Sequence, residues 1–302
     1  MNVNRLKLEL FYLIKAFKYN KVGRAYLYYK YFFAPKILKS NKLFERPITD
    51  SNLSIHILTC HRDVVILLWS LATYYNVSNV IGELFIHDDG SLAESDKKSI
   101  KKFFPNSRII NDQVFLHQAS HQLDRYPNIK EFRIKNKKFV LLRKLIDPYF
   151  ISDKKYRLII DSDLLWFNHP GQIAEQFEAG CNQSLMMIAD TSCPVYFEDG
   201  KKFPDNLAKF NSGIVLYRQD NFDLAKLESY LMALDMNNND NRHFIEQAGY
   251  SYCLKNIEPL NIGQYIVKGR VESQTVMRHY TSPRRVLFYA EGLRILKNKG
   301  YV

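Results

Sequence analysis

The chain has 302 residues, of which 46% are hydrophobic, and its formal net charge at pH 7 is +12. This length and hydrophobic content suit one large globular domain, or one domain with appendages, that buries a full core. They exclude a chain built around membrane-spanning helices, because the longest apolar run, residues 64–69, is far shorter than the roughly 20 residues that a bilayer requires.

Cysteine usage and the N-terminal residues indicate a cytoplasmic protein. The four cysteines (Cys60, Cys181, Cys193 and Cys253) have no C-x-x-C spacing, which argues against a disulfide framework or a zinc knuckle and predicts reduced thiols. Lys7 and Glu9 precede only a short apolar stretch, so no cleaved secretory signal is predicted.

Residues 1–50 form a basic, aromatic segment, which we expect to be helical and distinct from residues 51–302. Seven lysines and two arginines stand against Glu9 alone in residues 1–39. An apolar stripe recurs at helical spacing and consists of Leu6, Leu10, Leu13, Ile14 and Phe17. This pattern is typical of peripheral contact with an anionic lipid surface, here the inner face of the cell membrane. A helix packed on the domain with a solvated basic face is an equal alternative. No nucleic-acid module accompanies the segment, so nucleic acid is not predicted as a partner.

From Leu53 onward, predicted strands alternate with predicted helices. The strands are 54–59, 80–87, 108–110, an apolar run from 156, 184–189 and 210–217. The helices are 63–75, 97–104, 139–146 with a break at Pro148, 172–178, 222–234 and 243–249. Such alternation predicts an α/β fold with a mostly parallel central sheet and helices on both faces.

Polar residues follow three of these strands at their carboxyl ends, where ligands bind in open α/β sheets. Thr59 and Arg62 follow the first strand, Asp88 and Asp89 follow the second, and an aspartate pair follows the fourth. We expect Thr59 to contact the ligand, Asp88 or Asp89 to accept hydrogen bonds from a base or ribose, and Arg62 to meet a phosphate. A simple Asp-Asp-Gly turn is the alternative for the second strand end.

Asp161 and Asp163 are the strongest candidate site in the sequence. Because side chains two apart on a strand point the same way, these carboxylates are expected to converge on one cation at a solvent-facing strand end, with Ser162 beside the ligand. Two hard carboxylates suit Mg²⁺ or Mn²⁺ and leave positions for diphosphate oxygens. His279 is the candidate third ligand, and its imidazole favours Mn²⁺.

These residues resemble the metal-dependent glycosyltransferases of the GT-A fold, and within them the glycogenin and lipopolysaccharide galactosyltransferase-like family. The resemblance covers residues 53–289. It depends on the D-x-D strand at 158–165, the N-S/A-G strand at 210–215, Glu246-Gln247 near the family's D-Q pair, and the late histidine segment at 279–284. The family's histidine is normally followed by Gly and Lys-Pro-Trp, whereas this chain has Arg284 and Arg285.

The resemblance implies a nucleotide-sugar transferase in which Asp161, Asp163 and His279 bind Mn²⁺ (or Mg²⁺) and the metal holds the donor diphosphate. It implies that Asn211, Ser212 and Gly213 line the donor-sugar or acceptor side, with the glycine letting the backbone approach the ligand. It also implies a UDP-sugar donor. The expected acceptor is a glycan, a lipid-linked saccharide or another hydroxyl, in polysaccharide or lipopolysaccharide assembly.

The reaction itself requires positive charge, because breaking the anomeric C–O bond builds negative charge on the departing diphosphate. The candidate cations are Arg143, Lys144, Lys268 and Arg284. Glu246 and Gln247 are candidates beside the anomeric carbon, Glu246 as a general base in an inverting enzyme or as a polar stabiliser in a retaining one. An ordinary exposed helical glutamate is the alternative for Glu246.

Two other functions compete with sugar transfer. A haloacid-dehalogenase-type phosphatase would use Asp161 as nucleophile and Asp163 as acid, but its D-x-D motif opens the first strand, and here the motif falls past residue 150. A non-catalytic scaffold with a nucleotide-sugar fold at the membrane would suit the basic N-terminus equally well, but it gives no reason for Asp161, Asp163 and His279 to occur together.

Overall fold

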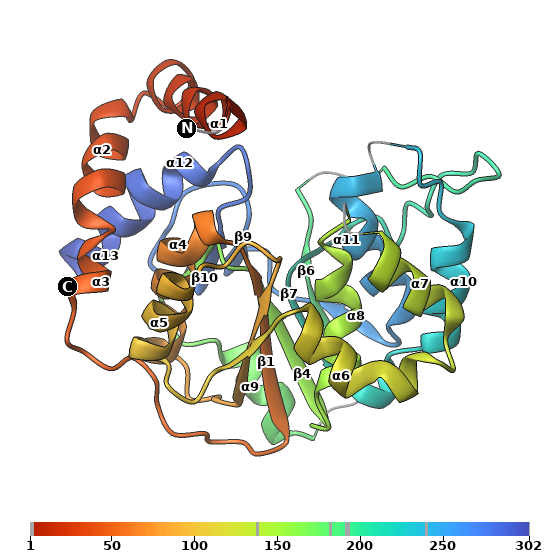
Figure 1. The fold of residues 1–302 in the computed structure, drawn as a ribbon. Helices are drawn as coiled ribbons and strands as arrows, with labels where there is room; N and C mark the ends of the chain where they lie inside the picture. Colours follow the sequence, from red (N-terminus) through yellow and green to blue (C-terminus); the bar gives the residue numbers. More distant parts are fainter. Residues whose placement is uncertain (1–2, 137–138, 181–182, 191–193, 239–240, 302) are drawn as a thin grey trace.

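A computed structural model describes residues 3–136, 139–180, 183–190, 194–238 and 241–301. Its centre is a seven-stranded sheet in the order β3-β2-β1-β4-β7-β6-β8 (Figure 1). The strands are β1 (Leu53–Thr59), β2 (Glu83–Asp88), β3 (Arg108–Ile110), β4 (Tyr156–Ile160), β6 (Ser184–Ile188), β7 (Phe210–Arg218) and β8 (Ile257–Pro259). Strand β7 runs antiparallel to both of its neighbours, and the other pairs are parallel. The predicted mostly parallel sheet is confirmed.

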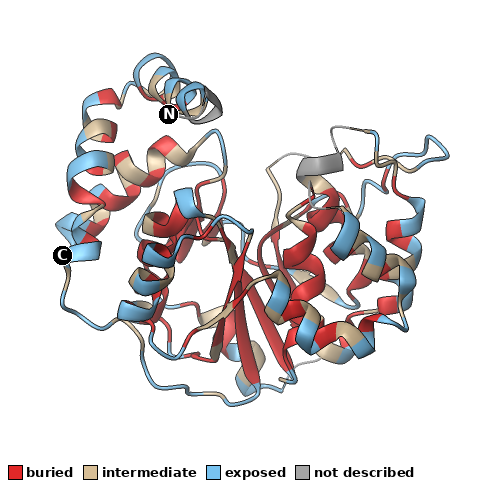
Figure 2. Cartoon of the chain, viewed as in Figure 1, coloured by how far each residue is buried: buried red, intermediate tan, exposed pale blue. Residues whose placement is uncertain are grey.

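Helices cover both faces of this sheet (Figures 1 and 2). On one face lie α4 (Val64–Val77), α5 (Glu94–Phe103) and α9 (Gly171–Glu178); on the other lie α6 (Asp112–Leu123), α7 (Pro127–Lys135), α8 (Leu142–Ile151), α10 (Leu224–Ala233) and α11 (Asn241–Cys253). Consecutive strand residues enter opposite cores: Leu158 and Ile160 enter one, and Ile159 enters the other. Burial on both faces explains why apolar residues stand at successive strand positions, as at Leu158, Ile159 and Ile160.

Helix α8 corrects one prediction, because it continues through Pro148 instead of breaking there. A proline has no N–H, so the carbonyl of Lys144, four residues earlier, lacks its usual helical donor. The hydroxyl of Tyr250 in α11 donates to that carbonyl at 2.5 Å. This bond replaces the missing partner and ties α8 to α11 next to Lys144.

A second, three-stranded sheet was not predicted and is essential for the site. Its order is β5-β10-β9, with β5 (Leu164–Trp166), β10 (Met277–His279) and β9 (Tyr265–Ile266). Strand β5 follows the D-x-D residues directly, and its antiparallel pairing with β10 sets His279 opposite Leu164. The pairing therefore brings residue 279 to the end of β4.

The predicted N-terminal helical appendage is present and packs against the end of the chain (Figure 1). It comprises α1 (Val3–Ile14), η1 (Lys15–Tyr19), α2 (Gly23–Tyr28), η2 (Tyr29–Phe33) and α3 (Lys36–Lys39), and the C-terminal elements are α12 (Arg285–Leu287), η5 (Phe288–Leu293) and α13 (Arg294–Asn298). The Phe33 ring stacks on Trp69 with centroids 5.5 Å apart, and the Trp69 indole N–H donates to the carbonyl of Ala34 at 3.0 Å. The segment thus contributes side chains to the main core.

Leu13 of the predicted apolar stripe packs against the C-terminal elements, but the buried face of α1 and η1 is made by other residues. Tyr12 and Ala16 are buried, together with Val286 and Ala290 of the C-terminal elements. Most of the stripe is exposed instead, at 53% for Leu6, 55% for Leu10, 44% for Ile14 and 52% for Phe17. The first helix therefore presents an unpartnered apolar surface to its surroundings.

Across the described ranges, none of the helices has the length and apolar character needed to cross a bilayer. Cys60 and Cys253 are free thiols. Cys181 and Cys193 lie outside the described residues.

Candidate active site

The candidate site lies at the carboxyl ends of the adjacent parallel strands β1 and β4. The order of the strands along the chain reverses between them, and open α/β sheets bind ligands at such a point. The predicted continuous D-x-D strand is wrong, because β4 ends at Ile160 and β5 begins at Leu164. Asp161 and Asp163 belong to the turn between them. The Asp161 N–H donates to the Gly213 carbonyl at 2.9 Å and the Tyr280 N–H donates to the Asp163 backbone carbonyl at 3.0 Å, and both bonds fix the turn backbone.

Asp163 also departs from the expected solvent-facing position. Its residue is only 5% exposed, and its Oδ2 accepts from Arg285 Nε at 3.0 Å. Asp161 has a side chain that is 27% exposed. The pair is therefore asymmetric, with one carboxylate held inside the protein and the other at the cavity wall.

Asp161, Asp163 and His279 bring three potential ligand atoms within 4.8 Å of one another. His279 Nε2 lies 3.2 Å from Asp161 Oδ2 and 3.1 Å from Asp163 Oδ1. Burial lowers the pKa of His279, but the attraction of the two carboxylates outweighs it and raises this pKa to about 9. Two carboxylates and an imidazole are a donor set that suits Mn²⁺, so these residues fit the metal that the resemblance implies.

Asn211 orients the histidine. Its Oδ1 accepts from the Gly213 N–H at 2.9 Å and lies 3.1 Å from His279 Nδ1. An oxygen that already accepts from a backbone N–H leaves Nδ1 as the donor, which directs Nε2 toward the carboxylates. Metal-bound histidines are commonly oriented in this way by an acceptor on the other nitrogen.

Gly213 makes room for this imidazole. A Cβ at Gly213 would lie 2.4 Å from His279 Nδ1, closer than atoms can approach. The sequence predicted that this glycine lets the backbone approach the ligand. The space beside the Gly213 Cα is occupied by the His279 imidazole. The lack of a side chain at Gly213 therefore allows His279 to lie beside Asp161 and Asp163.

Lys144 is a buried cation shared by two carboxylates. Its Nζ lies 2.7 Å from Asp161 Oδ1 and 3.1 Å from Glu246 Oε1, and it donates to the Ser212 carbonyl at 2.6 Å. Burial lowers the pKa of Lys144, but the two carboxylates outweigh it and raise this pKa above its usual value. The same ammonium, with His279, holds the pKa of Asp161 low despite burial.

Glu246 is buried, so the alternative of an exposed helical glutamate is wrong. Its Oε2 accepts from Ser212 Oγ at 2.7 Å. Burial raises the pKa of Glu246 in spite of the nearby Lys144 ammonium. The adjacent Gln247 accepts from Asn211 Nδ2 at 3.0 Å, which links α11 to the residue that orients His279.

These side chains line one cavity of about 570 Å³. Among the predicted site residues, it brings together Lys144, Asp161, Asp163, Asn211, Ser212, Glu246, Gln247, His279 and Arg284. Arg284 pairs with Asp190, which also lines the cavity. Lys268 reaches Asp190 from outside, with its Nζ 3.5 Å from Asp190 Oδ2.

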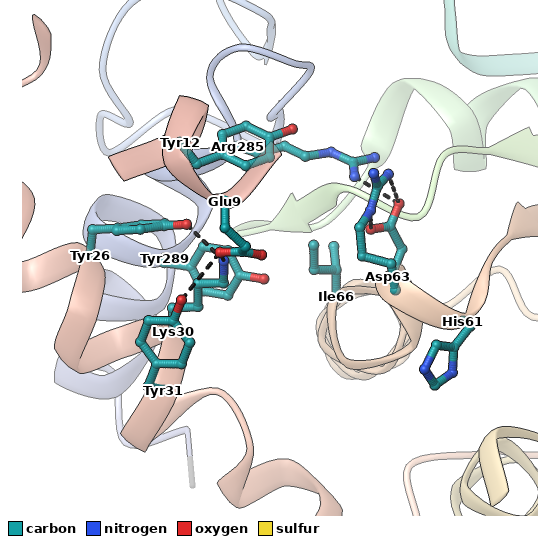
Figure 3. A pocket seen from close by; sticks show the side chains of 11 residues that line it. Glu9, Tyr12, Tyr26, Lys30, Tyr31, His61, Asp63, Ile66, Arg285 and Tyr289 are labelled. Atoms are coloured by element: carbon teal, nitrogen blue, oxygen red, sulfur yellow. Dashed lines mark hydrogen bonds and ion pairs between the residues drawn. The ribbon is translucent and has the colours of Figure 1, made fainter. Parts of the chain in front are cut away.

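The remaining predicted residues are not among those that line this cavity. The Asp88 carboxylate accepts from the N–H groups of Gly90 and Leu92, and the Asp89 carboxylate accepts from Ser91, so the motif forms the turn that was the alternative. Arg143 donates to the Asp88 carbonyl at 2.5 Å. Thr59 and Ser162 are buried. Arg62 pairs with Asp63 and faces a second cavity (Figure 3).

Arg285 and Asp190 are site residues that the sequence analysis missed. Arg285 bridges Asp163 and Asp63, with Nη1 2.7 Å from Asp63 Oδ2. The sequence signal was present, because Arg285 adjoins the candidate Arg284 and Asp63 follows the first polar strand end. Choosing between two adjacent arginines requires knowledge of where α12 begins, which the sequence does not give.

Comparison of the sequence with known protein families and with curated proteins gives no match. Comparison of the structure does. The apo structure of the bifunctional glycosyltransferase WbbM is similar, with a TM-score of 0.51 and 11% identity over 84% of this chain and 52% of that one. This chain thus spans about half of the WbbM structure. The apo structure of mouse xyloside xylosyltransferase 1 is also similar, with a TM-score of 0.48 and 11% identity over 78% of this chain and 98% of that one. So is the galactosyltransferase LgtC in complex with donor and acceptor sugar analogs, with a TM-score of 0.47 and 14% identity over 82% of this chain and 95% of that one. The predicted GT-A fold is confirmed.

Proposed function

We propose that the protein transfers a sugar from a nucleotide-diphosphate sugar to a hydroxyl acceptor. The observation that carries this proposal is the cluster of Asp161, Asp163 and His279 at the carboxyl edge of a GT-A sheet, open to a cavity of about 570 Å³. The UDP donor and the glycan or lipid-linked acceptor come from the sequence resemblance. Nothing in the comparisons supports the phosphatase or the scaffold.

The proposed chemistry separates diphosphate stabilisation from sugar positioning. Asp161, Asp163 and His279 would hold Mn²⁺ or Mg²⁺, which supplies positive charge to the departing diphosphate. Arg284 lines the cavity and Arg285 holds Asp163, and guanidinium groups of this kind can bind phosphate oxygens. Lys144 keeps the Asp161 carboxylate ionised and oriented, because its ammonium is only 2.7 Å away.

Glu246, Gln247 and Asn211 line the same cavity, and we propose that the sugar and acceptor meet beside them. Glu246 is fixed by Ser212 and Lys144, and its raised pKa makes it a better proton acceptor than an ordinary glutamate. This arrangement suits both roles that the sequence left open, a general base or a polar stabiliser.

Thermal unfolding in the presence of nucleotide sugars tests the proposed function. We expect at least one nucleotide sugar, most of all a UDP-sugar, to raise the unfolding temperature with Mn²⁺ and much less without it, because ligand binding stabilises the folded state. The same compound should then be hydrolysed slowly in the presence of Mn²⁺. A full set of nucleotide sugars that shifts nothing, with or without metal, contradicts sugar transfer.

We further propose that α1 and its flanking residues bind an anionic membrane surface. The exposed apolar side chains of α1 and η1 lie among lysines, and Lys15 Nζ sits 4.4 Å from the centre of the exposed Tyr19 ring. Apolar side chains that enter the lipid boundary, together with lysines that attract anionic headgroups, are what interfacial helices require. An acceptor carried by a lipid would then be presented near the site.

Vesicle sedimentation with point variants tests this surface, since deleting the segment would remove core residues such as Phe33. Leu10→Ser combined with Phe17→Ser should reduce binding to vesicles containing phosphatidylglycerol by about thirtyfold, because each exposed apolar side chain contributes about 1 kcal/mol or more when buried in lipid. Added salt should weaken wild-type binding. Met232→Ser is the control, since Met232 is an apolar residue that is likewise exposed, at 64%, but it lies on α10 and not on the N-terminal helices. Equal sedimentation of all three proteins contradicts membrane contact.

A further inference from the structure

Helices α8 and α11 pack against each other beside the candidate site (Figure 1). Gly249 of α11 allows a close approach, because a Cβ at this position would lie 2.4 Å from Leu145 Cδ2 of α8. Lys144 precedes Leu145 in the chain and Tyr250 follows Gly249, so the same approach brings Lys144 and Tyr250 together. Both are buried, with Lys144 2% and Tyr250 0% exposed. The contact between the two helices therefore includes the buried cation of the candidate site.

Helix α11 holds both the side chain and the backbone of Lys144. The Lys144 ammonium lies 3.1 Å from Glu246 Oε1, and the Lys144 carbonyl accepts from the Tyr250 hydroxyl at 2.5 Å. Glu246 and Tyr250 are four residues apart in α11, which places them on the same helix face. One face of α11 thus fixes Lys144 at two points.

The bond from Tyr250 is required because of Pro148. In a regular helix the N–H of residue 148 would donate to the carbonyl of Lys144, and proline has no N–H. A buried carbonyl without a donor is unfavourable, so another group must take that place. Burial, with the nearby Tyr217 and Glu246, raises the pKa of Tyr250 well above its usual value, so its hydroxyl remains protonated and able to donate. A local helical bond is therefore replaced by one that comes from a second helix.

The position of Lys144 matters because its ammonium serves several acceptors at once. Besides Glu246, it contacts Asp161 Oδ1 at 2.7 Å and the Ser212 carbonyl at 2.6 Å. A shift of α8 relative to α11 would change these contacts together. Misplacement of a group in an active site by about 1 Å can lower the reaction rate by as much as about a hundredfold. The anchor of α8 at Lys144 is therefore expected to influence the reaction.

We propose that Tyr250 is a positioning residue for the transfer reaction, whose hydroxyl holds the Lys144 carbonyl so that the Lys144 ammonium stays between Asp161 and Glu246. This inference rests on the proposed function. Tyr250 is not among the residues that line the cavity, so it acts through Lys144 and not by contact with the substrate.

Paired changes at Tyr250 and Pro148 test the proposal, because both act on the same carbonyl. Tyr250→Phe removes the donor and should lower kcat for hydrolysis of the nucleotide sugar selected by thermal unfolding by about tenfold, with KM changed by less than about threefold. Adding Pro148→Ala provides a backbone N–H for that carbonyl, and the double variant should recover kcat to within about threefold of the wild type. Pro148→Ala alone should resemble the wild type, since a carbonyl oxygen can accept from two donors.

The Lys144 ammonium provides a readout that does not depend on turnover. In protein labelled with ¹⁵N-lysine, a buried ammonium with fixed acceptors exchanges slowly with water and gives an NMR signal, whereas freely exposed ammonium groups exchange too fast to be seen. The Lys144 signal is identified by its absence from Lys144→Arg, which keeps the charge. We expect this signal to shift or disappear in Tyr250→Phe and to return in the double variant.

Tyr217→Phe is the matched control. Tyr217 is also 0% exposed and its ring centre lies 6.1 Å from that of Tyr250, but its hydroxyl has no hydrogen-bond partner within the described part of the chain. Its loss should leave kcat and the Lys144 signal unchanged.

Several results would overturn the positioning role. Wild-type kcat or an unchanged Lys144 signal in folded Tyr250→Phe does so, and so does a loss of kcat that Pro148→Ala fails to restore. If Tyr250→Phe alone does not fold, a double variant that is folded and active supports the role, and one that is inactive or unfolded overturns it. A wild type that turns over no nucleotide sugar overturns the proposed function, while the ammonium signal still tests the contact between Tyr250 and Lys144.

Discussion

Asp161→Asn is expected to lower Mn²⁺-stimulated hydrolysis and transfer of the donor sugar by about 10³-fold, because a bound metal contributes several kcal/mol to the stabilisation of a leaving diphosphate. The change keeps the size of the side chain and removes its charge. Lys144 loses one anionic partner but retains Glu246 at 3.1 Å, so the buried ammonium stays paired and the fold is expected to persist. Initial rates at saturating donor and direct Mn²⁺ titration measure the two effects.

Asp161 is a cleaner target than Asp163. Replacing Asp163 by alanine also removes a partner of the partly buried Arg285, which is expected to destabilise the protein and confuse the assay. Asp153→Asn is the matched control, since its side chain is 91% exposed and it precedes β4 at the opposite end. Wild-type rates in Asp161→Asn would refute the metal role of the cluster.

Phe33→Ala is expected to lower the free energy of unfolding by about 3–5 kcal/mol, the usual cost of removing a fully buried phenylalanine. Phe33 is 1% exposed and packs against Trp69. The two tryptophans, Trp69 and Trp166, both lie beyond residue 50. Their fluorescence in a urea titration therefore reports whether the N-terminal segment stabilises the rest of the chain.

The neighbouring Phe32 provides the control for this measurement. Phe32→Ala should change the free energy of unfolding by no more than about 0.5 kcal/mol, because Phe32 is 68% exposed and surface substitutions usually have small effects. A Phe33→Ala variant with an unchanged tryptophan transition would show that residues 1–50 unfold independently, as a separate unit. The boundary at residue 50 stays a prediction until then.

The sheet was predictable because its strands are buried on both faces. The runs at β1 and β4 are buried at successive positions and most of their residues are apolar, so they are visible without knowledge of their neighbours. Pro148 misled the prediction, since the donor that replaces its missing N–H is Tyr250, about a hundred residues away. Local sequence rules do not include such distant partners.

The asymmetry within the site was not predictable for the same reason. Asp161 and Asp163 look equivalent in the sequence, yet Arg285 holds one and Lys144 the other. Gly213 looked like a ligand contact, but its role follows from the position of His279 on a strand 66 residues later. The small sheet that sets this position has strands of only two or three residues, too short for periodicity to reveal.

The sequence by itself determined the α/β architecture, the helical N-terminus and the residue types of a metal-diphosphate site, since each follows from burial pattern or from the chemistry of nearby residues. Tertiary structure alone decided which cation pairs with which carboxylate, which face of α1 is covered and that Tyr12 and Tyr31 border a cavity beside Arg285. Those outcomes depend on contacts between residues up to about 270 positions apart, such as Tyr12 and Ser282. Packing and the electrostatics of buried groups act through space, so no local pattern in the chain encodes them.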